Sequence, residues 1–196
     1  MKYFYSLLIV LFFIACTDNA HKNQTTYRFT DQEGQPIKIQ TDFNTFDIFS
    51  DTPKPQDIEK TTLIMFLDLS SENSKDYILG LNHLTQTFPK AYIIGILTQK
   101  YPNTEIDQYI QTNHIHFPIL NPTDSKNLLD DFFKKINESD EKVNPTDETQ
   151  AQQTDTSSKI PFFVLYDKHG KKYQTYTGMI PEEMFAYDID TLSKKH

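Results

Sequence analysis

The stretch most diagnostic of the fold runs Ile160-Pro161-Phe162-Phe163-Val164-Leu165-Tyr166-Asp167-Lys168-His169-Gly170-Lys171. Its apolar first half, Ile160–Tyr166, predicts a buried β-strand. The polar residues that follow, Asp167–Gly170, are of the kind that joins two strands of a hairpin. Lys171–Tyr176 then alternates in side-chain character, which favours a partner strand. The stretch therefore predicts an antiparallel β-hairpin.

Upstream of this hairpin, strands and helices alternate along the chain. Apolar runs predict buried strands at 62–67 and 91–97, and a short strand at 117–120. Pro118 restricts this last strand to a sheet edge, because proline cannot donate to a ladder. Apolar residues at helical spacing predict helices in the remaining segments, around 75–88, 106–110, 124–136 and 181–192. Asp124 or Ser125 would cap the third of these helices. This order indicates an α/β sheet with an antiparallel edge.

The N-terminal part of the domain is expected to add a second hairpin. Tyr27–Thr30 and Ile37–Ile39 alternate between apolar and polar residues around a glycine-containing turn. Residues 40–60 include Pro53 and Pro55, and we expect no regular element there.

Composition excludes some classes of partner. The 196-residue chain has a formal net charge of −8, and 13% of its residues are aromatic. Nucleic-acid binding requires a basic patch, and this balance of charge provides none. A polybasic contact with a membrane surface is excluded in the same way.

The only cysteine, Cys16, closes a hydrophobic run that follows Lys2. The run is shorter than the ~20 residues of a spanning helix and has the length of a signal-peptide core. With Ala15 before the cysteine, it resembles a bacterial lipoprotein signal, although Phe13 stands where that signal usually has an aliphatic residue. The resemblance implies that Cys16 is lipidated and becomes the mature N-terminus.

We therefore expect four segments in the chain. Residues 1–15 would be a lipoprotein signal peptide and residues 16–26 a flexible polar tether. Residues 27–196 would form one domain. Within it, 137–159 is almost devoid of apolar side chains, which predicts a disordered polar insertion.

Four segments of the domain resemble the TlpA/ResA-type thioredoxin family of exported, membrane-tethered proteins. They are residues 27–37, 63–66, 117–120 and 160–171. The resemblance implies a thioredoxin-like fold: a central mixed β-sheet flanked by helices, with an N-terminal β-hairpin. It also implies a cis bond between Ile160 and Pro161. Ile160 would then face the active-site loop and offer its backbone to a substrate peptide. A purely structural cis-proline explains the residue equally well.

The sequence differs from the family at the two cysteines that carry the family's redox chemistry. Where the family carries Trp-Cys-X-X-Cys, this chain has Ser70-Ser71-Glu72-Asn73-Ser74, so that Ser71 and Ser74 match the two cysteines. A serine hydroxyl forms no disulfide, and thiol–disulfide exchange needs a thiolate. We expect no thiol–disulfide oxidoreductase activity, no catalytic residue of that type and no cofactor.

Other polar residues have both a structural and a functional interpretation. Ser71 or Ser74 is expected to cap a helix through its side-chain oxygen, since no Gly-x-Ser-x-Gly motif accompanies either. His114 and His116 would share one face of an extended segment and could hold a metal with further ligands. Asp68 could bind the backbone of a partner or simply end its strand.

Two further histidines have simpler interpretations. His83 lies among helix residues, on the surface or in the core, and His169 is expected to be solvated in its hairpin turn.

These observations favour a lipid-anchored, redox-inactive thioredoxin-like domain in the bacterial cell envelope. It would face the periplasm and bind a protein partner or an unfolded segment. The first alternative is an envelope enzyme with a non-thiol site, such as a metal held partly by His114 and His116. The second is a partner-assisted role in thiol or cytochrome maturation. Thr17, in place of the aspartate that retains some lipoproteins at the inner membrane, favours the outer membrane.

Overall fold

A computed structural model describes residues 24–50, 60–141 and 160–194. Several segments discussed above lie outside the described residues: the predicted signal peptide, Cys16, most of the predicted tether, Pro53, Pro55 and residues 142–159. Within the described ranges, no helix has both the length and the apolar character that crossing a membrane requires.

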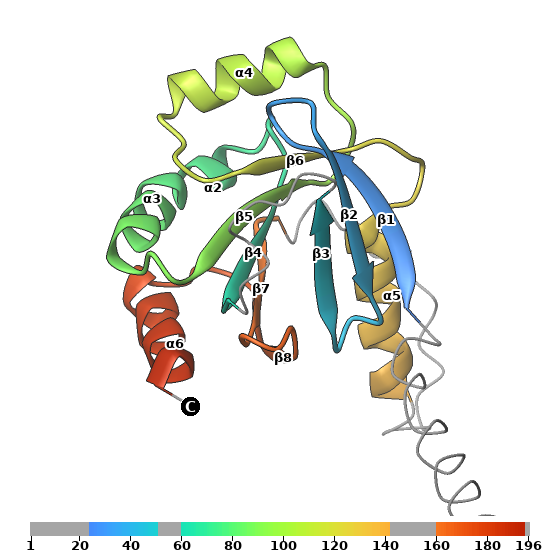
Figure 1. Ribbon diagram of the computed structural model, residues 1–196, viewed down its shortest axis with the longest axis vertical. Coiled ribbons are helices and arrows are strands. Elements are labelled where there is room, and N and C mark those ends of the chain that lie inside the picture. The colour runs from blue at the N-terminus through green and yellow to red at the C-terminus, as the bar shows by residue number, and fades with distance from the viewer. Residues whose placement is uncertain (1–23, 51–59, 142–159, 195–196) are drawn as a thin grey trace, which may run out of the picture.

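One mixed sheet of eight strands organises the domain, in the order β3-β2-β1-β6-β5-β4-β7-β8 (Figure 1). Strands β4, β5 and β6 are parallel, and the other pairings are antiparallel. The strands are β1 (Thr25–Thr30), β2 (Pro36–Thr41), β3 (Phe46–Ser50), β4 (Thr62–Leu67), β5 (Tyr92–Leu97), β6 (Ile119–Pro122), β7 (Phe162–Tyr166) and β8 (Lys172–Tyr176). The helices are α2 (Glu72–Lys75), α3 (Ile78–Thr87), α4 (Asn103–Thr112), α5 (Leu128–Glu141) and α6 (Glu182–Lys194).

The sheet separates two hydrophobic cores, because consecutive side chains of a strand point to opposite faces. In β4, Leu63 and Met65 enter one core, and Ile64 and Phe66 enter the other. The first core also takes residues from α3, α4 and α6, and the second takes residues from β1, β2 and α5. Burial on both faces explains why the β4 sequence is a continuous apolar run.

Both predicted hairpins are present. In the N-terminal one, β1 pairs with β2, and Asp31 accepts hydrogen bonds from the backbone of Glu33 and Gln35 across the turn. Strand β1 begins at Thr25, two residues inside the segment assigned to the tether.

The expectation of no regular element in residues 40–60 was wrong, since β3 pairs with β2 there. A polar turn makes this possible: the Asp42 carboxylate accepts hydrogen bonds from the backbone of Asn44 and Thr45. The start of β3 also reaches the β7–β8 turn, where the Phe46 amide donates to the Gly170 carbonyl over 2.8 Å.

The placement of the 117–120 segment at a sheet edge was wrong. Strand β6 lies inside the sheet, between β1 and β5. Pro118 precedes the strand and takes part through its carbonyl, which accepts a hydrogen bond from the Gly95 amide. Because Pro118 lies before the first residue of β6, its missing N–H group removes no hydrogen bond from the strand itself.

The predicted cap of the helix after β6 was also wrong. The Asn127 side chain, and not Asp124 or Ser125, accepts hydrogen bonds from the amides of Leu129 and Asp130. This leaves a loop between Pro122 and the first turn of α5. The helix continues to Glu141 and so includes the first residues of the segment predicted as an insertion.

Candidate functional site

The loop between β4 and α2 is held by Asp68. The Oδ1 atom of Asp68 accepts hydrogen bonds from the Ser70 amide at 2.8 Å, from the Ser70 hydroxyl and from the Tyr101 hydroxyl at 2.8 Å. Burial opposes ionisation of this carboxyl, but the hydrogen bonds from Ser70 and Tyr101 outweigh it and lower the pKa. Asp68 therefore remains charged at neutral pH and shapes the loop.

Tyr101 is positioned in turn by Asn121, a buried residue of β6. The Asn121 side chain accepts from the Tyr101 amide at 3.1 Å and donates to the Tyr101 carbonyl at 2.8 Å. The carboxyl-terminal ends of β4, β5 and β6 are thus tied together. The sequence patterns did not predict this network, although the polar Asn121 within an apolar strand was the available signal.

Ser71 and Ser74 have different environments. Ser71 occupies the N-cap position of α2 and is partly exposed, but its side chain makes no capping hydrogen bond. Ser74 is fully buried, and its hydroxyl has no hydrogen-bond partner among the described residues. The expectation that either serine caps a helix through its side-chain oxygen was therefore wrong, because the Asp68 side chain holds this loop instead.

A large open groove lies next to this loop, with a volume of about 1040 Å³. Ile160 and Pro161 line it, and the peptide bond between them is cis, as the family resemblance implies. Asn73 from α2 also lines it, whereas Ser71 and Ser74 are not among its lining residues. Buried residues of both cores contribute to the walls, among them Leu81, Phe133, Phe162 and Phe185.

Two apolar side chains on the groove are exposed to solvent. Leu79 of α3 is 81% exposed, and Met179, in the loop between β8 and α6, is 96% exposed. Large exposed side chains that line one concavity mark a candidate interaction site. Neither residue was predicted from the sequence, because Leu79 lies off the buried stripe of its helix and Met179 follows Gly178 in a loop.

The loop that carries Met179 is fixed by Tyr77. The Tyr77 hydroxyl donates to the Gly178 carbonyl at 2.9 Å and accepts from the Ile180 amide at 3.0 Å. Gly178 has a φ of +83°, a backbone conformation that favours glycine. The tyrosine ring also packs on Phe163, with 4.9 Å between centroids. Met179 is thus presented on an anchored turn.

His114 and His116 do not lie in an extended segment. His114 has a φ of +52° in the turn after α4, and both side chains are exposed. Their backbone is held by Asn82, which donates to the His114 carbonyl at 2.7 Å and accepts from the His116 amide at 2.8 Å. Among the described residues, no group of three histidine, cysteine or acidic side chains could hold a metal.

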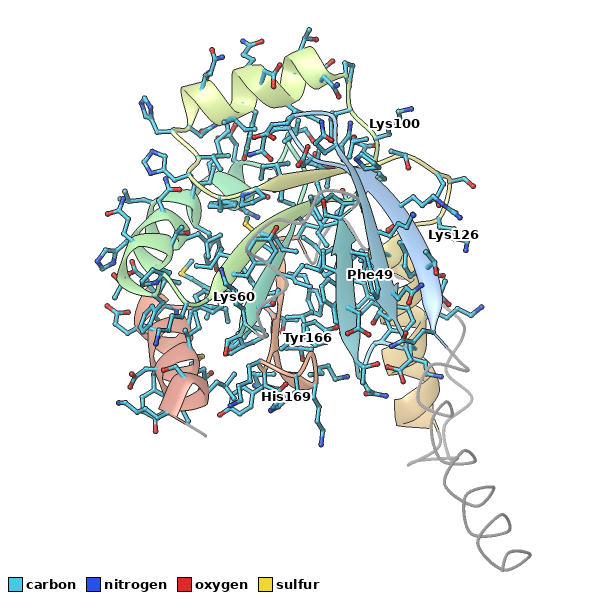
Figure 2. The ribbon with its side chains drawn as sticks, viewed as in Figure 1. Phe49, Lys60, Lys100, Lys126, Tyr166 and His169 are labelled. Atoms are coloured by element: carbon cyan, nitrogen blue, oxygen red, sulfur yellow. The ribbon has the colours of Figure 1, made fainter. Side chains whose placement is uncertain are left out.

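The other two histidines among the described residues lie outside the network of Asp68. His83, on the surface of α3, contacts Glu182 of α6 through its Nδ1 atom. His169 is exposed on the β7–β8 turn, at the opposite end of the domain from Lys100, which precedes Tyr101 (Figure 2).

Solved structures of thioredoxin-type proteins align with nearly the whole chain. An uncharacterised thioredoxin-like protein from Porphyromonas gingivalis is 14% identical with a TM-score of 0.56, over 91% of this chain and 97% of the other. BsSco, a member of the Sco family of cytochrome c oxidase assembly proteins in which a disulfide switch was identified, is 12% identical with a TM-score of 0.55, over 92% and 98%. A thiol:disulfide interchange protein from Chlorobium tepidum is 13% identical with a TM-score of 0.54, over 90% and 99%.

These likenesses show that the chain has a thioredoxin-like fold, as the sequence predicted. No protein-family model and no curated protein matches the sequence.

Proposed function

We propose that this chain is a lipid-anchored, redox-inactive thioredoxin-like protein of the cell envelope, whose groove beside Pro161 binds an extended segment of a partner protein. The observation that carries the proposal is the exposure of Leu79 and Met179 on the groove that Ile160 and Pro161 line. When a partner covers exposed apolar side chains, their removal from water lowers the free energy and favours binding. The anchored turn at Tyr77 supports the same interpretation, because a preorganised surface loses little entropy on binding.

Redox inactivity rests on the sequence. Cys16 is the only cysteine, and serines stand at the two positions that match the family's cysteines. A disulfide within the chain needs two thiols. In an insulin-reduction assay we expect no turnover by the protein. Turnover that persists in a Cys16→Ala variant would refute this part of the proposal.

The lipid anchor rests on the resemblance of residues 1–16 to a lipoprotein signal. A lipid on Cys16 would hold the domain at a membrane and face it toward the periplasm. Fractionation of cells that express Cys16→Ala should recover the protein in the soluble envelope fraction. Continued membrane association at an unchanged mass would contradict lipidation.

Site-specific photocrosslinking in intact bacterial cells tests partner binding. A photoreactive residue at Met179 should form discrete crosslinked products that disappear when Leu79→Arg is added. The control position is Asp107, which is exposed on α4 and does not line the groove. The same products from both positions, or products that survive Leu79→Arg, would count against a groove that binds a partner.

A further inference from the structure

The charged side chains among the described residues of the groove all have one sign. Of the described residues that line it, Asp76 and Glu182 are acidic, and none is a lysine or arginine. They come from two elements, since Asp76 follows the last residue of α2 and Glu182 begins α6. A positively charged ligand group between them would be attracted by both carboxylates.

Toward the described residues, both carboxylates retain acceptor capacity. Asp76 is exposed, and its carboxylate makes no hydrogen bond or ion pair with any described residue. Glu182 contacts His83 through Oε1, whereas Oε2 has no hydrogen-bond partner among the described residues. A Cβ atom added at Gly80 would lie 3.1 Å from this Oε2 atom. The absence of a side chain at Gly80 therefore lets the Glu182 carboxylate lie close to α3.

The apolar part of the groove complements these charges. Leu79 lies on the same helix as Gly80, and Met179 lies three residues before Glu182. Methionine is unbranched and adapts its shape to different apolar partners. The groove thus combines two exposed apolar side chains, one of them an adaptable methionine, with two negative charges.

We propose that the groove selects extended peptide segments in which an apolar side chain is flanked by lysine or arginine. The apolar side chain packs against Leu79 and Met179, and the flanking cation pairs with Asp76 or Glu182. This inference rests on the proposed function, because it names the class of segment that the same groove binds. Each exposed ion pair is expected to contribute about two- to fivefold in affinity, since solvent weakens such pairs.

Three fluorescent peptides test this preference for flanking cations. They have equal length and the same apolar centre, which is flanked by lysine in one, by serine in another and by glutamate in the third. Their anisotropy is measured with the full-length protein in a neutral detergent. We expect the lysine peptide to bind about five- to twentyfold more tightly than the serine peptide, and the glutamate peptide to bind most weakly. The double variant Asp76→Asn with Glu182→Gln should reduce the lysine peptide to the affinity of the serine peptide.

A matched control removes two charges elsewhere. Glu105 and Asp107 are exposed on α4 and do not line the groove. Glu105→Gln with Asp107→Asn should keep the preference for lysine. If it removes the preference as fully as the groove variant does, the attraction comes from the net charge of −8 and the inference is wrong.

The remaining outcomes separate this inference from the proposed function. Equal binding of the three peptides, abolished by Leu79→Gln with Met179→Gln, would overturn the charge selection and leave a peptide-binding groove. If no peptide binds, or if that double variant leaves peptide binding unchanged, the proposed function itself is wrong. A dimer that dissociates on Asp76→Asn with Glu182→Gln would make a second copy of the chain the occupant and overturn the inference.

Discussion

Two regions of the domain differ in how far particular apolar side chains are buried. Between the N-terminal hairpin and α5, the ring of Phe43 packs edge-on against Tyr27 and Phe132, and Tyr27 and Phe132 are almost fully buried. On the groove, Leu79 and Met179 are mostly exposed. Apolar groups stabilise a fold only when folding removes them from water. The first region therefore contributes to stability, and the second is available for binding.

The largest effect on stability is expected from Phe132→Ala. Phe132 is 2% exposed and contacts the rings of Phe43 and Phe162. Removing a buried phenylalanine ring leaves a cavity, so we expect a loss of about 3–5 kcal/mol in the free energy of unfolding. Urea denaturation measures this loss. The matched control is Phe49→Ala on β3 (Figure 2), where the ring is 47% exposed and the loss should be clearly smaller. Equal losses would remove the distinction between buried and exposed rings.

A smaller effect is expected from Asn82→Ala, on the helix that presents Leu79 to solvent. Asn82 is a buried residue of α3, and its side chain bonds the backbone at His114 and His116. The substitution leaves a carbonyl and an amide without partners, which should cost about 1–3 kcal/mol of stability. The exposed Gln108→Ala is the control in the same denaturation experiment. A loss below about 0.5 kcal/mol for Asn82→Ala would show that water replaces these bonds.

Tyr27→Phe should have a modest effect that depends on pH. The Tyr27 hydroxyl donates to Asp131 of α5 at 2.7 Å, and its loss should cost about 1 kcal/mol near neutral pH. Burial, and then the carboxylate of Asp131, raise the pKa of Tyr27 above its usual value. The neutral phenol therefore stabilises the fold fully below the unfolded-state tyrosine pKa of about 10, and this contribution falls as pH rises from that value toward the higher folded-state pKa.

Denaturation between pH 8 and 11 measures this dependence. The Tyr27→Phe variant should lose less stability across that range than the wild type. Tyr187→Phe serves as the control, because Tyr187 is 70% exposed and should leave the profile unchanged. Parallel curves for wild type and Tyr27→Phe would mean that the hydroxyl does not titrate differently in the folded state.

The smallest effect on stability is expected in the groove. Leu79→Gln with Met179→Gln should change the free energy of unfolding by less than about 0.5 kcal/mol, because neither side chain is buried. The same pair should abolish binding of the lysine-flanked peptide, measured by anisotropy. A large loss of stability would show that Leu79 and Met179 help to stabilise the fold, as Phe132 does, and would contradict the distinction between the two regions.

Local patterns predicted most of the elements. The apolar run of β4 and the helical spacing of α3 and α6 depend on residues that are neighbours in the sequence. Strand β3 and the inner position of β6 were mispredicted, because strand pairing depends on partners far along the chain. Prolines near both segments indicated breaks, whereas Pro118 contributes a carbonyl to its neighbour β5.

The sequence by itself determined that the chain has no pair of thiols, whatever its fold, because Cys16 is its only cysteine. It also indicated Pro161 through the family resemblance. Only the tertiary structure decided that Leu79, Met179, Asp76 and Glu182 share one groove, since they come from α3, a loop, the end of α2 and the start of α6. Composition fixes which atoms are present, but a binding surface depends on distances between segments that no local pattern contains.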